Sequence, residues 1–343
     1  MSSKNLVRPA LFMIVVVVAV IGSWEYYLRA NGFILSYDDA APQWAAQRAM
    51  VYNSPKQTTV FIGSSRIKYD LDIPTWEKLT GRSAVQLSIE GNSPVPVLLD
   101  LADDTAFHGK LVVDVTEPLF FSNMPEYSKE PTGNINYYRS ETPAQKAGYY
   151  LNNLLESQFV FLDKRFLSLN AQLDKLPVPP RPGRQAFDVP MFPADFYKVS
   201  ASRQTYMDDR FVQDTLLQHM VQNIWAGFLT MGAKAPPPPP NMVPEVLKAV
   251  ATAVHKIKSR GGEVVFVRTP SSGMFWQVEQ KAFPREKLWD VLLASTQCPG
   301  IHFMDYESTR HFVCPEWSHL QPRDARAYTK ALISLLPPSF VQL

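Results

Sequence analysis

The sequence predicts an α/β protein in which a parallel sheet lies between two layers of helices, as a three-layer sandwich. Short runs rich in β-branched and aromatic residues alternate along the chain with longer stretches whose apolar residues recur at helical spacing. Strands separated by helices pair in parallel through right-handed crossovers, which place helices on both faces of the sheet. A separate apolar run near the N-terminus predicts one transmembrane helix in front of this domain.

The apolar run covers Ala10–Trp24, and the basic residues Lys4 and Arg8 precede it. Basic residues before a span and aromatic residues after it are typical of a cytoplasmic N-terminus and an outside exit. We therefore expect a cytoplasmic segment at 1–9 and a transmembrane anchor at 10–28.

The run is shorter than the ~20 residues that a span needs, so a cleaved signal peptide is the alternative interpretation. Gly22 and Ser23 are small enough to precede a cleavage site, but bulky Trp24 follows them and no A-x-A pattern is present. The anchor is therefore favoured, and both interpretations export the rest of the chain.

The charges are balanced, with 34 Lys and Arg against 32 Asp and Glu and a formal net charge of +2. This balance gives no broad attraction for nucleic acid, and the sequence contains no basic stripe, RNA-binding signature or finger-like Cys/His spacing. We therefore expect no nucleic-acid partner. The two cysteines, Cys298 and Cys314, are predicted to form a disulfide because the chain is exported. Two buried thiols are the alternative.

The first part of the sheet domain is predicted at 58–120, after a linker at 29–57. Three strands are expected in it, at 58–62, 84–89 and 111–116. Two helices connect them, at 72–81 and 96–107. Asp72 can cap the first helix, Pro74 fits its first turn and Gly81 can end it.

The second part of the sheet domain is predicted at 244–343. It begins with a helix that carries an apolar stripe at helical spacing and ends at Gly261 and Gly262. Two strands and two helices follow, the strands at 263–267 and 301–304 and the helices at 286–295 and 323–336.

Residues 121–243 interrupt this pattern and are predicted to form a cap inserted into the sheet domain. Helices are expected at 144–161 and 209–228. In the second helix apolar residues recur at every fourth position, at Val212, Leu216, Met220 and Ile224. The five prolines at 236–240 predict an extended spacer, and binding to a partner as a polyproline helix is the alternative.

The first predicted strand runs into Gly63-Ser64-Ser65. A serine on a sharp turn at the carboxyl end of a strand can expose its hydroxyl above the sheet, and a small neighbour lets backbone amides approach a substrate. The triplet alone is a weak signal, because most such triplets are ordinary turns.

Glu316 and His319 follow the fifth predicted strand. An acid three residues before a histidine can orient the imidazole, which can then take the proton from a serine hydroxyl. A lone histidine is more often a surface or helix-capping residue. Because the serine turn and this pair both follow parallel strands, their loops emerge at the same edge of the sheet, where they can meet.

These motifs together resemble the SGNH (GDSL-type) superfamily of hydrolases and acyltransferases. The likeness is to its membrane-anchored bacterial members, which serve D-alanyl transfer to lipoteichoic acid or the O-acetylation of exopolysaccharides. It covers roughly residues 58–120 and 244–336. The second block of the family, a glycine after the next strand, is matched by Gly91.

The resemblance implies a flavodoxin-like parallel sheet. It also implies that Ser65 is the nucleophile, that His319 is the base and that Glu316 orients the base. The acid is a glutamate where the family usually has an aspartate, and a glutamate can serve the same role.

The third block of the family supplies an asparagine to the oxyanion hole, and this chain has none where its third strand ends. The hole would then rest on the backbone amides of Ser65 and Gly91. The side chain of Asn92 or the hydroxyl of Thr116 would assist. Losing one such donor typically lowers the rate about 10²–10³-fold.

Arg66, Thr116 and Arg268 are candidate substrate-binding residues, although solvated or structural arginines are commoner. Side chains that can bind metal also gather late in the sequence, at His302, Asp305, His311, Cys314, Glu316 and His319. No pair among them has a recognised metal-binding spacing, so we expect neither a metal nor another cofactor.

The sequence therefore predicts a serine acyl-transfer enzyme on the outer face of a bacterial inner membrane. We expect an O-acetyltransferase or acetylesterase that acts on an exported or cell-surface polysaccharide through an acyl-serine intermediate. A membrane-bound O-acyltransferase or a polysaccharide synthase is the expected partner. The alternative is a non-catalytic scaffold or glycan-binding subunit of an envelope polysaccharide complex.

Overall fold

The computed structural model describes residues 4–53, 58–174, 176 and 192–341 of the chain. The chain forms two compact units. The first unit contains Met1–Asp38 and Ala147–Val189, and the second contains Asp39–Lys146 and Pro190–Leu343.

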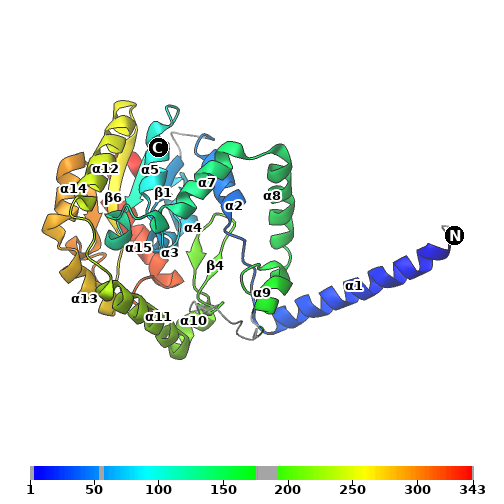
Figure 1. Cartoon of the computed structure of the whole chain (residues 1–343). Coiled ribbons are helices and arrows are strands. Elements are labelled where there is room, and N and C mark those ends of the chain that lie inside the picture. Colours follow the sequence, from blue (N-terminus) through cyan, green and yellow to red (C-terminus); the bar gives the residue numbers. More distant parts are fainter. Residues whose placement is uncertain (1–3, 54–57, 175, 177–191, 342–343) are drawn as a thin grey trace. The chain divides into compact units, whose positions relative to one another are not determined.

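A five-stranded sheet forms the centre of the second unit, with the order β2-β1-β3-β6-β7 (Figure 1). All neighbouring strands are parallel. The strands are β1 (Thr58–Ile62), β2 (Ser83–Gln86), β3 (Lys110–Asp114), β6 (Glu263–Arg268) and β7 (Gly300–His302). The predicted α/β class and parallel sheet are therefore confirmed. In a sheet of this order the direction of the crossovers reverses between β1 and β3, and ligands of such sheets bind beyond the carboxyl ends of the strands there.

β2 and β3 end earlier than the sequence predicts. After β2, the N–H of Leu87 still donates to the carbonyl of Phe61 at 2.8 Å, and that of Ile89 to the carbonyl of Gly63 at 3.1 Å. Both apolar side chains are buried. The apolar pattern therefore continues past the regular strand, because the chain stays against β1 as it leaves the sheet.

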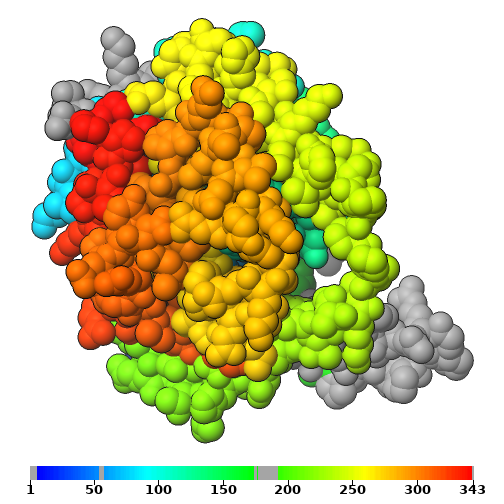
Figure 2. Space-filling model, turned by 90° about the vertical axis from the view of Figure 1, so that its left-hand side faces the viewer, coloured from blue at the N-terminus to red at the C-terminus, as the bar shows by residue number. Residues whose placement is uncertain are grey.

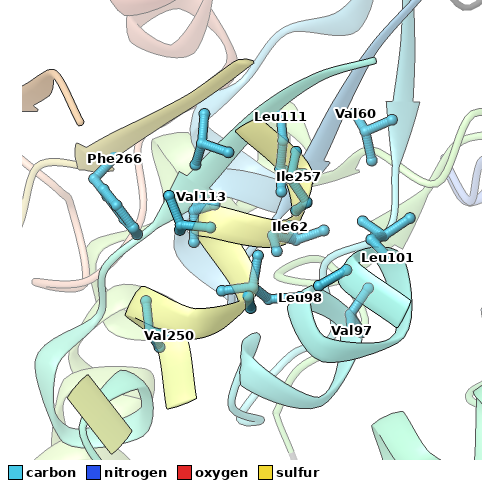
Figure 3. Close-up of a cluster of buried hydrophobic side chains, with 14 of the residues drawn as sticks. Val60, Ile62, Val97, Leu98, Leu101, Leu111, Val113, Val250, Ile257 and Phe266 are labelled. Atoms are coloured by element: carbon cyan, nitrogen blue, oxygen red, sulfur yellow. The ribbon is translucent and has the colours of Figure 1, made fainter. Parts of the chain in front are cut away.

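Both faces of the sheet are covered by apolar side chains. On one face the strand residues Val60, Ile62 and Val113 pack against α5 (Val95–Asp103) and α12 (Met242–Ser259), as Figure 3 shows. The opposite face packs against α4 (Ile73–Thr80) and α15 (Pro322–Leu335) through Phe61, Val112 and Val265. Alternate residues of one strand point to opposite faces, which explains why whole strands, and not alternate residues, are apolar.

The caps predicted for the helix at 72–81 are confirmed in α4. The carboxylate of Asp72 accepts a hydrogen bond from the N–H of Thr75 at 2.9 Å, and Gly81 ends α4 in the left-handed conformation, at φ 65°. These are the roles that an N-cap aspartate and a C-terminal glycine usually have.

The linker predicted at 29–57 is wrong for α2 (Ala41–Met50), which belongs to the core of the second unit. Trp44 is buried and its indole N–H donates to the carbonyl of Leu87 at 3.0 Å. Arg48 is also buried and pairs with Asp100 of α5. The sequence did not indicate this helix, because its proline, glutamine and arginine residues leave no apolar stripe at helical spacing. Such a short helix is stabilised mainly by its contacts with neighbouring elements.

Much of the surface seen in Figure 2, coloured yellow to red, belongs to the C-terminal half of the second unit. Besides α12 and α15 it contains α13 (Gly273–Ala282), α14 (Trp289–Thr296), α16 (Pro338–Val341) and two short 3₁₀ helices, η3 (Arg285–Lys287) and η4 (Phe303–Asp305). The predicted strands and helices are present in this half in the predicted order, but α13 and α16 were not predicted.

The insertion at 121–243 is divided between the two units. Its elements, with the short helix that precedes them, are α6 (Glu117–Phe120), η1 (Pro125–Tyr127), α7 (Lys129–Ser140), α8 (Pro143–Glu156), η2 (Val160–Leu162), α9 (Leu169–Asp174), β4 (Lys198–Val199), β5 (Thr205–Tyr206), α10 (Asp209–Gln213) and α11 (Thr215–Lys234). β4 and β5 form a small antiparallel pair. Residues 236–240 form an exposed connection between α11 and α12.

The helix predicted at 209–228 is divided into α10 and α11. Val212 of its predicted apolar stripe lies on α10 and packs against a buried cluster, but two residues of the stripe on α11 do not face the core. Leu216 is 76% exposed and Met220 is 47% exposed. The side of α11 that packs instead carries Leu217, Val221 and Trp225. Both sets have a spacing of four residues, so periodicity alone could not choose between them.

The first unit begins with α1 (Lys4–Ala30). Its segment Leu6–Ala30 is long and apolar enough to cross a membrane, and a signal sequence would meet the same test. The apolar helix extends beyond Trp24, because Tyr26, Tyr27 and Leu28 continue it. The helix is therefore longer than the apolar run Ala10–Trp24 and reaches the length that a membrane span needs.

Candidate functional site

The serine turn lies where β1 passes into α3 (Ser65–Asp70). Gly63 makes the turn, and the side chain of Asp114 lies against it. A Cβ atom on Gly63 would lie 2.5 Å from the Cβ of Asp114, so no larger residue fits without movement. The backbone of the turn therefore approaches the end of β3 as closely as glycine allows.

The two serines of the turn differ in their surroundings. The hydroxyl of Ser64 lies 2.7 Å from that of Thr116 and 3.3 Å from the carboxylate of Asp114. It also accepts the N–H of Arg66, as the N-cap of α3. Ser64 is buried, whereas Ser65 at the first position of α3 is partly exposed. Ser65 is therefore the serine whose hydroxyl remains available.

The pair that the sequence predicts between Glu316 and His319 is present in the loop before α15. The Nδ1 of His319 lies 3.0 Å from Oε1 of Glu316, and the same oxygen accepts the backbone N–H of His319 at 2.6 Å. Both side chains are buried. The carboxylate accepts this hydrogen bond when Nδ1 carries a proton, and in the neutral imidazole of that tautomer Nε2 presents a lone pair.

Backbone strain accompanies this loop at Trp317, which has a φ of 80°. A large residue rarely adopts this left-handed conformation, and such strain gathers at functional sites. The indole of Trp317 lies over Gly273, where a Cβ atom would come within 2.3 Å of the ring. The N–H of Ser272 also donates to the carbonyl of Trp317 at 2.9 Å. The segment that follows β6 therefore holds the strained residue in place.

The serine turn and the histidine loop meet although they lie about 250 residues apart. The guanidinium of Arg66 donates to Ser318 at 3.4 Å. The ring of Tyr69 lies 4.3 Å from that of His319, between centroids. At the end of α3, the carboxylate of Asp70 accepts a hydrogen bond from the N–H that follows His319, at 2.8 Å. All three contacts join α3, the helix that begins at Ser65, to the segment 318–320.

No hydrogen bond joins Ser65 to His319 within the described residues. The Nε2 of His319 is buried and has no hydrogen-bond partner among them. A buried polar atom without a partner is unfavourable by about 1–3 kcal/mol. His319 is thus held through Nδ1, and its Nε2 makes no hydrogen bond within the described residues.

The insertion covers the histidine, which is only 1% exposed. The ring of Phe196, just before β4, lies 5.7 Å from that of His319, and the ring of Trp225 on α11 lies 6.1 Å from it, between centroids. The indole N–H of Trp225 also donates to Oε2 of Glu316. Sequence analysis missed Trp225, because nothing in the spacing of α11 links it to a loop 91 residues later.

The predicted oxyanion donors differ in whether they already make hydrogen bonds within the protein. Gly91 lies in a turn after β2 with a φ of 66°, and the backbone N–H groups of Gly91 and Ser65 have no acceptor among the described residues. Asn92 is engaged elsewhere, because its side-chain nitrogen donates to the carbonyl of Glu90 at 2.8 Å and to Glu130 at 3.0 Å. The two backbone N–H groups therefore remain candidate oxyanion donors, whereas the side chain of Asn92 does not.

Thr116 is also engaged, since its hydroxyl donates to Asp114 at 3.0 Å and contacts Ser64. Burial raises the pKa of Asp114 above its ordinary value and raises that of Asp70 well above it. Two carboxyl groups beneath the serine turn thus resist ionisation.

Arg66 and Arg268 have a different role from the one that the sequence predicts. Both are buried, and both pair with Glu279 of α13. Arg268 also pairs with Glu117 at 3.0 Å. Burial opposes the ionisation of Glu279, but the two arginines outweigh it and lower the pKa of this carboxyl to about 2. These arginines tie α3, β6 and α13 together, and we do not retain them as substrate-binding residues.

The predicted disulfide is wrong, because Cys298 and Cys314 are both free and buried. They belong to apolar clusters on opposite faces of the sheet. Burial raises the pKa of both thiols, so neither is a reactive thiolate. Proximity in sequence was misleading here, since β7 passes between the two positions.

The metal-binding side chains that lie close together late in the sequence are not arranged as a metal site within the described residues, where no three such groups are placed to hold an ion. His302 is instead stacked on Phe303 at 5.3 Å between ring centroids. Burial and the nearby charge of Arg268 lower its pKa to about 3, so its ring is neutral and structural.

A comparison with family models finds no match to this chain, and a comparison with curated proteins finds none either.

Proposed function

We propose that this protein is a membrane-anchored serine acyl-transfer enzyme of the SGNH type, with Ser65, His319 and Glu316 as its catalytic residues. The observation that carries the proposal is the state of His319. Its Nδ1 is held by a buried carboxylate, its Nε2 is buried and without a partner, and its loop meets the helix that begins at Ser65.

In the first step the hydroxyl of Ser65 attacks the carbonyl carbon of an acyl ester, and Nε2 of His319 takes the hydroxyl proton. The imidazolium that results is stabilised by Glu316. The backbone N–H groups of Ser65 and Gly91 stabilise the negative oxygen of the tetrahedral intermediate. When the intermediate collapses, the bond to the leaving alcohol breaks, and His319 returns the proton to that alcohol.

In the second step a hydroxyl group of a sugar attacks the acyl-serine, and His319 removes its proton. Water in the same position would give hydrolysis. The aromatic cover of Phe196 and Trp225 over His319 favours transfer, because it limits the access of water to the base. We propose acetyl transfer to an exported or cell-surface polysaccharide, with a membrane-bound O-acyltransferase or a polysaccharide synthase as partner.

The proposed location is the outer face of a bacterial inner membrane. Lys4 and Arg8 precede the apolar part of α1, and exposed Tyr26 and Tyr27 follow it. This order supports a cytoplasmic N-terminus and an anchored domain outside.

The test compares acetyl-ester turnover by the full chain with that of Ser65→Ala and Ser64→Ala. We expect Ser65→Ala to lose about 10⁴-fold or more of the activity. Ser64→Ala removes the buried hydroxyl that caps α3 and contacts Thr116 and Asp114, but it leaves the hydroxyl of Ser65 in place, so it is the matched control and should keep most of the activity. Equal turnover by Ser65→Ala and the wild type would refute the proposed nucleophile.

A second candidate function is a non-catalytic scaffold or glycan-binding subunit of the same kind of complex. It is favoured by the lack of a hydrogen bond between Ser65 and His319 among the described residues and by the lack of an oxyanion asparagine. The two functions differ in cells: unchanged polysaccharide acetylation with Ser65→Ala would favour the scaffold. Increased acetylation would instead identify an esterase that removes acetyl groups.

A further inference from the structure

The first unit exposes many large apolar side chains outside α1. Leu151 is 64% exposed, Leu154 60% and Leu155 47%. Their spacing places all three on one side of α8, which we call the apolar face of α8. Further exposed apolar residues of the unit are Tyr150, Phe159, Leu169, Leu173 and Leu176. Gatherings of this kind usually mark an interaction surface.

The chain that follows α8 is fixed to the C-terminal end of α1. The carboxylate of Glu25 accepts the N–H groups of Val160 and Phe161 at 3.0 and 3.1 Å. Arg29 donates to the carbonyl of Gln158 at 2.7 Å and to Glu25 at 2.7 Å. The end of α8 is therefore held within a few residues of the last turns of α1.

These last turns also carry the aromatic residues that mark the depth of a membrane surface. Trp24, Tyr26 and Tyr27 flank Glu25 and are exposed. Tryptophan and tyrosine beside a span lie at the level of the lipid headgroups. Figure 1 shows α8 and α9 at this end of α1 and not along its apolar length, and none of the apolar window of α1 is buried.

The charges of the same stretch suit an anionic lipid surface. Its acidic side chains Glu156 and Asp163 are buried, whereas Lys164, which pairs with Asp38, and Arg165 are exposed. Basic residues near the membrane are attracted to anionic headgroups. An apolar helix face with exposed basic residues beside it is typical of a helix that lies in the membrane interface.

We propose that the apolar face of α8, with the exposed leucines of α9, lies in the outer interface of the membrane that α1 crosses. This inference rests on the anchor in the proposed function but not on the proposed chemistry. The first unit would then contact the membrane at two places, through α1 and through α8, and this would restrict its rotation about α1.

The test uses the full chain in vesicles that contain phosphatidylglycerol, with one spin label at a time. Leu154→Cys places the label on the apolar face of α8, and Asn153→Cys places it one residue away on another side of the same helix. The native cysteines are buried, and labelled wild type measures their background. We expect the label at Leu154 to collide more with oxygen, which dissolves in lipid, and the label at Asn153 to collide more with a water-soluble nickel complex.

Val16→Cys, in the middle of the apolar run, tests the anchor separately. Water contact at Leu154 together with lipid contact at Val16 would overturn the inference and leave the anchor intact. Broadening of the Leu154 signal by a second label would show that another copy of the chain covers the face, and would also overturn it. If α1 proves to be cleaved, the anchor fails, and the Leu154 label on protein added to the same vesicles still decides whether α8 enters lipid.

Discussion

The serine turn and the histidine loop are held in place by different means. The serine turn lies between β1 and α3, and a glycine, an N-cap and the end of β3 fix its backbone. The histidine loop has no regular structure. It depends on Glu316, on the strained Trp317 and on an indole from the insertion. The comparison shows that the proposed nucleophile follows from the topology of the sheet, whereas the proposed base depends on contacts between distant segments.

The histidine loop is tested most strongly by Glu316→Gln. The amide would keep a similar size but no negative charge, and it could turn an N–H toward Nδ1 of His319. We expect acetyl-ester turnover to fall about 10⁴-fold, as when the acid of a catalytic triad is replaced by its amide. The control is Glu307→Gln in the segment before the loop, where Glu307 is exposed. A small loss in the Glu316 variant, with the fold intact by circular dichroism, would contradict the proposed role.

The serine turn is tested by Gly63→Ala. The added methyl group would collide with Asp114 and with Ile67, which lie 2.5 and 2.6 Å from the new Cβ position. We expect the free energy of unfolding to fall by roughly 1–3 kcal/mol, measured by chemical denaturation. Gly133→Ala in α7 is the matched control, because no atom of the described residues lies within 4 Å of its Cβ position. A helical alanine there should add ~0.5–1 kcal/mol. Equal stability of the two variants would show that the turn is not tightly packed.

The contribution of the insertion to the histidine loop is tested by Trp225→Phe. The variant keeps an aromatic ring near His319 but removes the N–H that binds Glu316. We expect kcat to fall roughly 10-fold, the effect of one lost hydrogen bond to a charged group, with little change in KM. Trp276→Phe on α13 is the control, since that ring packs against Phe303. If both variants lose the same activity, Trp225 has no positioning role.

The smallest expected effect is a change in pH dependence caused by Asp70→Asn. Burial raises the pKa of Asp70 in the folded protein, so the folded state holds its proton at pH values where the unfolded chain has lost it. The free energy of unfolding therefore falls as the pH rises from about 4, the ordinary value, through the raised pKa. The asparagine variant keeps an oxygen for the N–H of Leu320 and should lose the part of this slope that comes from Asp70, while buried Asp114 keeps its own part. Denaturation at a series of pH values measures it, and an unchanged slope would contradict the assignment to Asp70.

Local signals in the sequence predicted the regular elements well. Asp72 and Gly81 marked both ends of α4, and the apolar runs of β1 and β6 appeared where the structure has strands. Glu316 and His319 were paired correctly because three residues of separation let the two side chains meet within one loop. These features depend on backbone conformation and on neighbours within a few positions, and a single sequence records both.

Only the tertiary structure decided which side of α11 packs, where Arg66 and Arg268 point and which partner Glu316 finds on the insertion. It also separated Cys298 from Cys314 by placing them on opposite faces of the sheet. Each of these outcomes depends on segments that are distant in sequence. Such contacts are set by the packing of the whole domain, because burial of a residue is a property of its surroundings and not of its place in a periodic pattern.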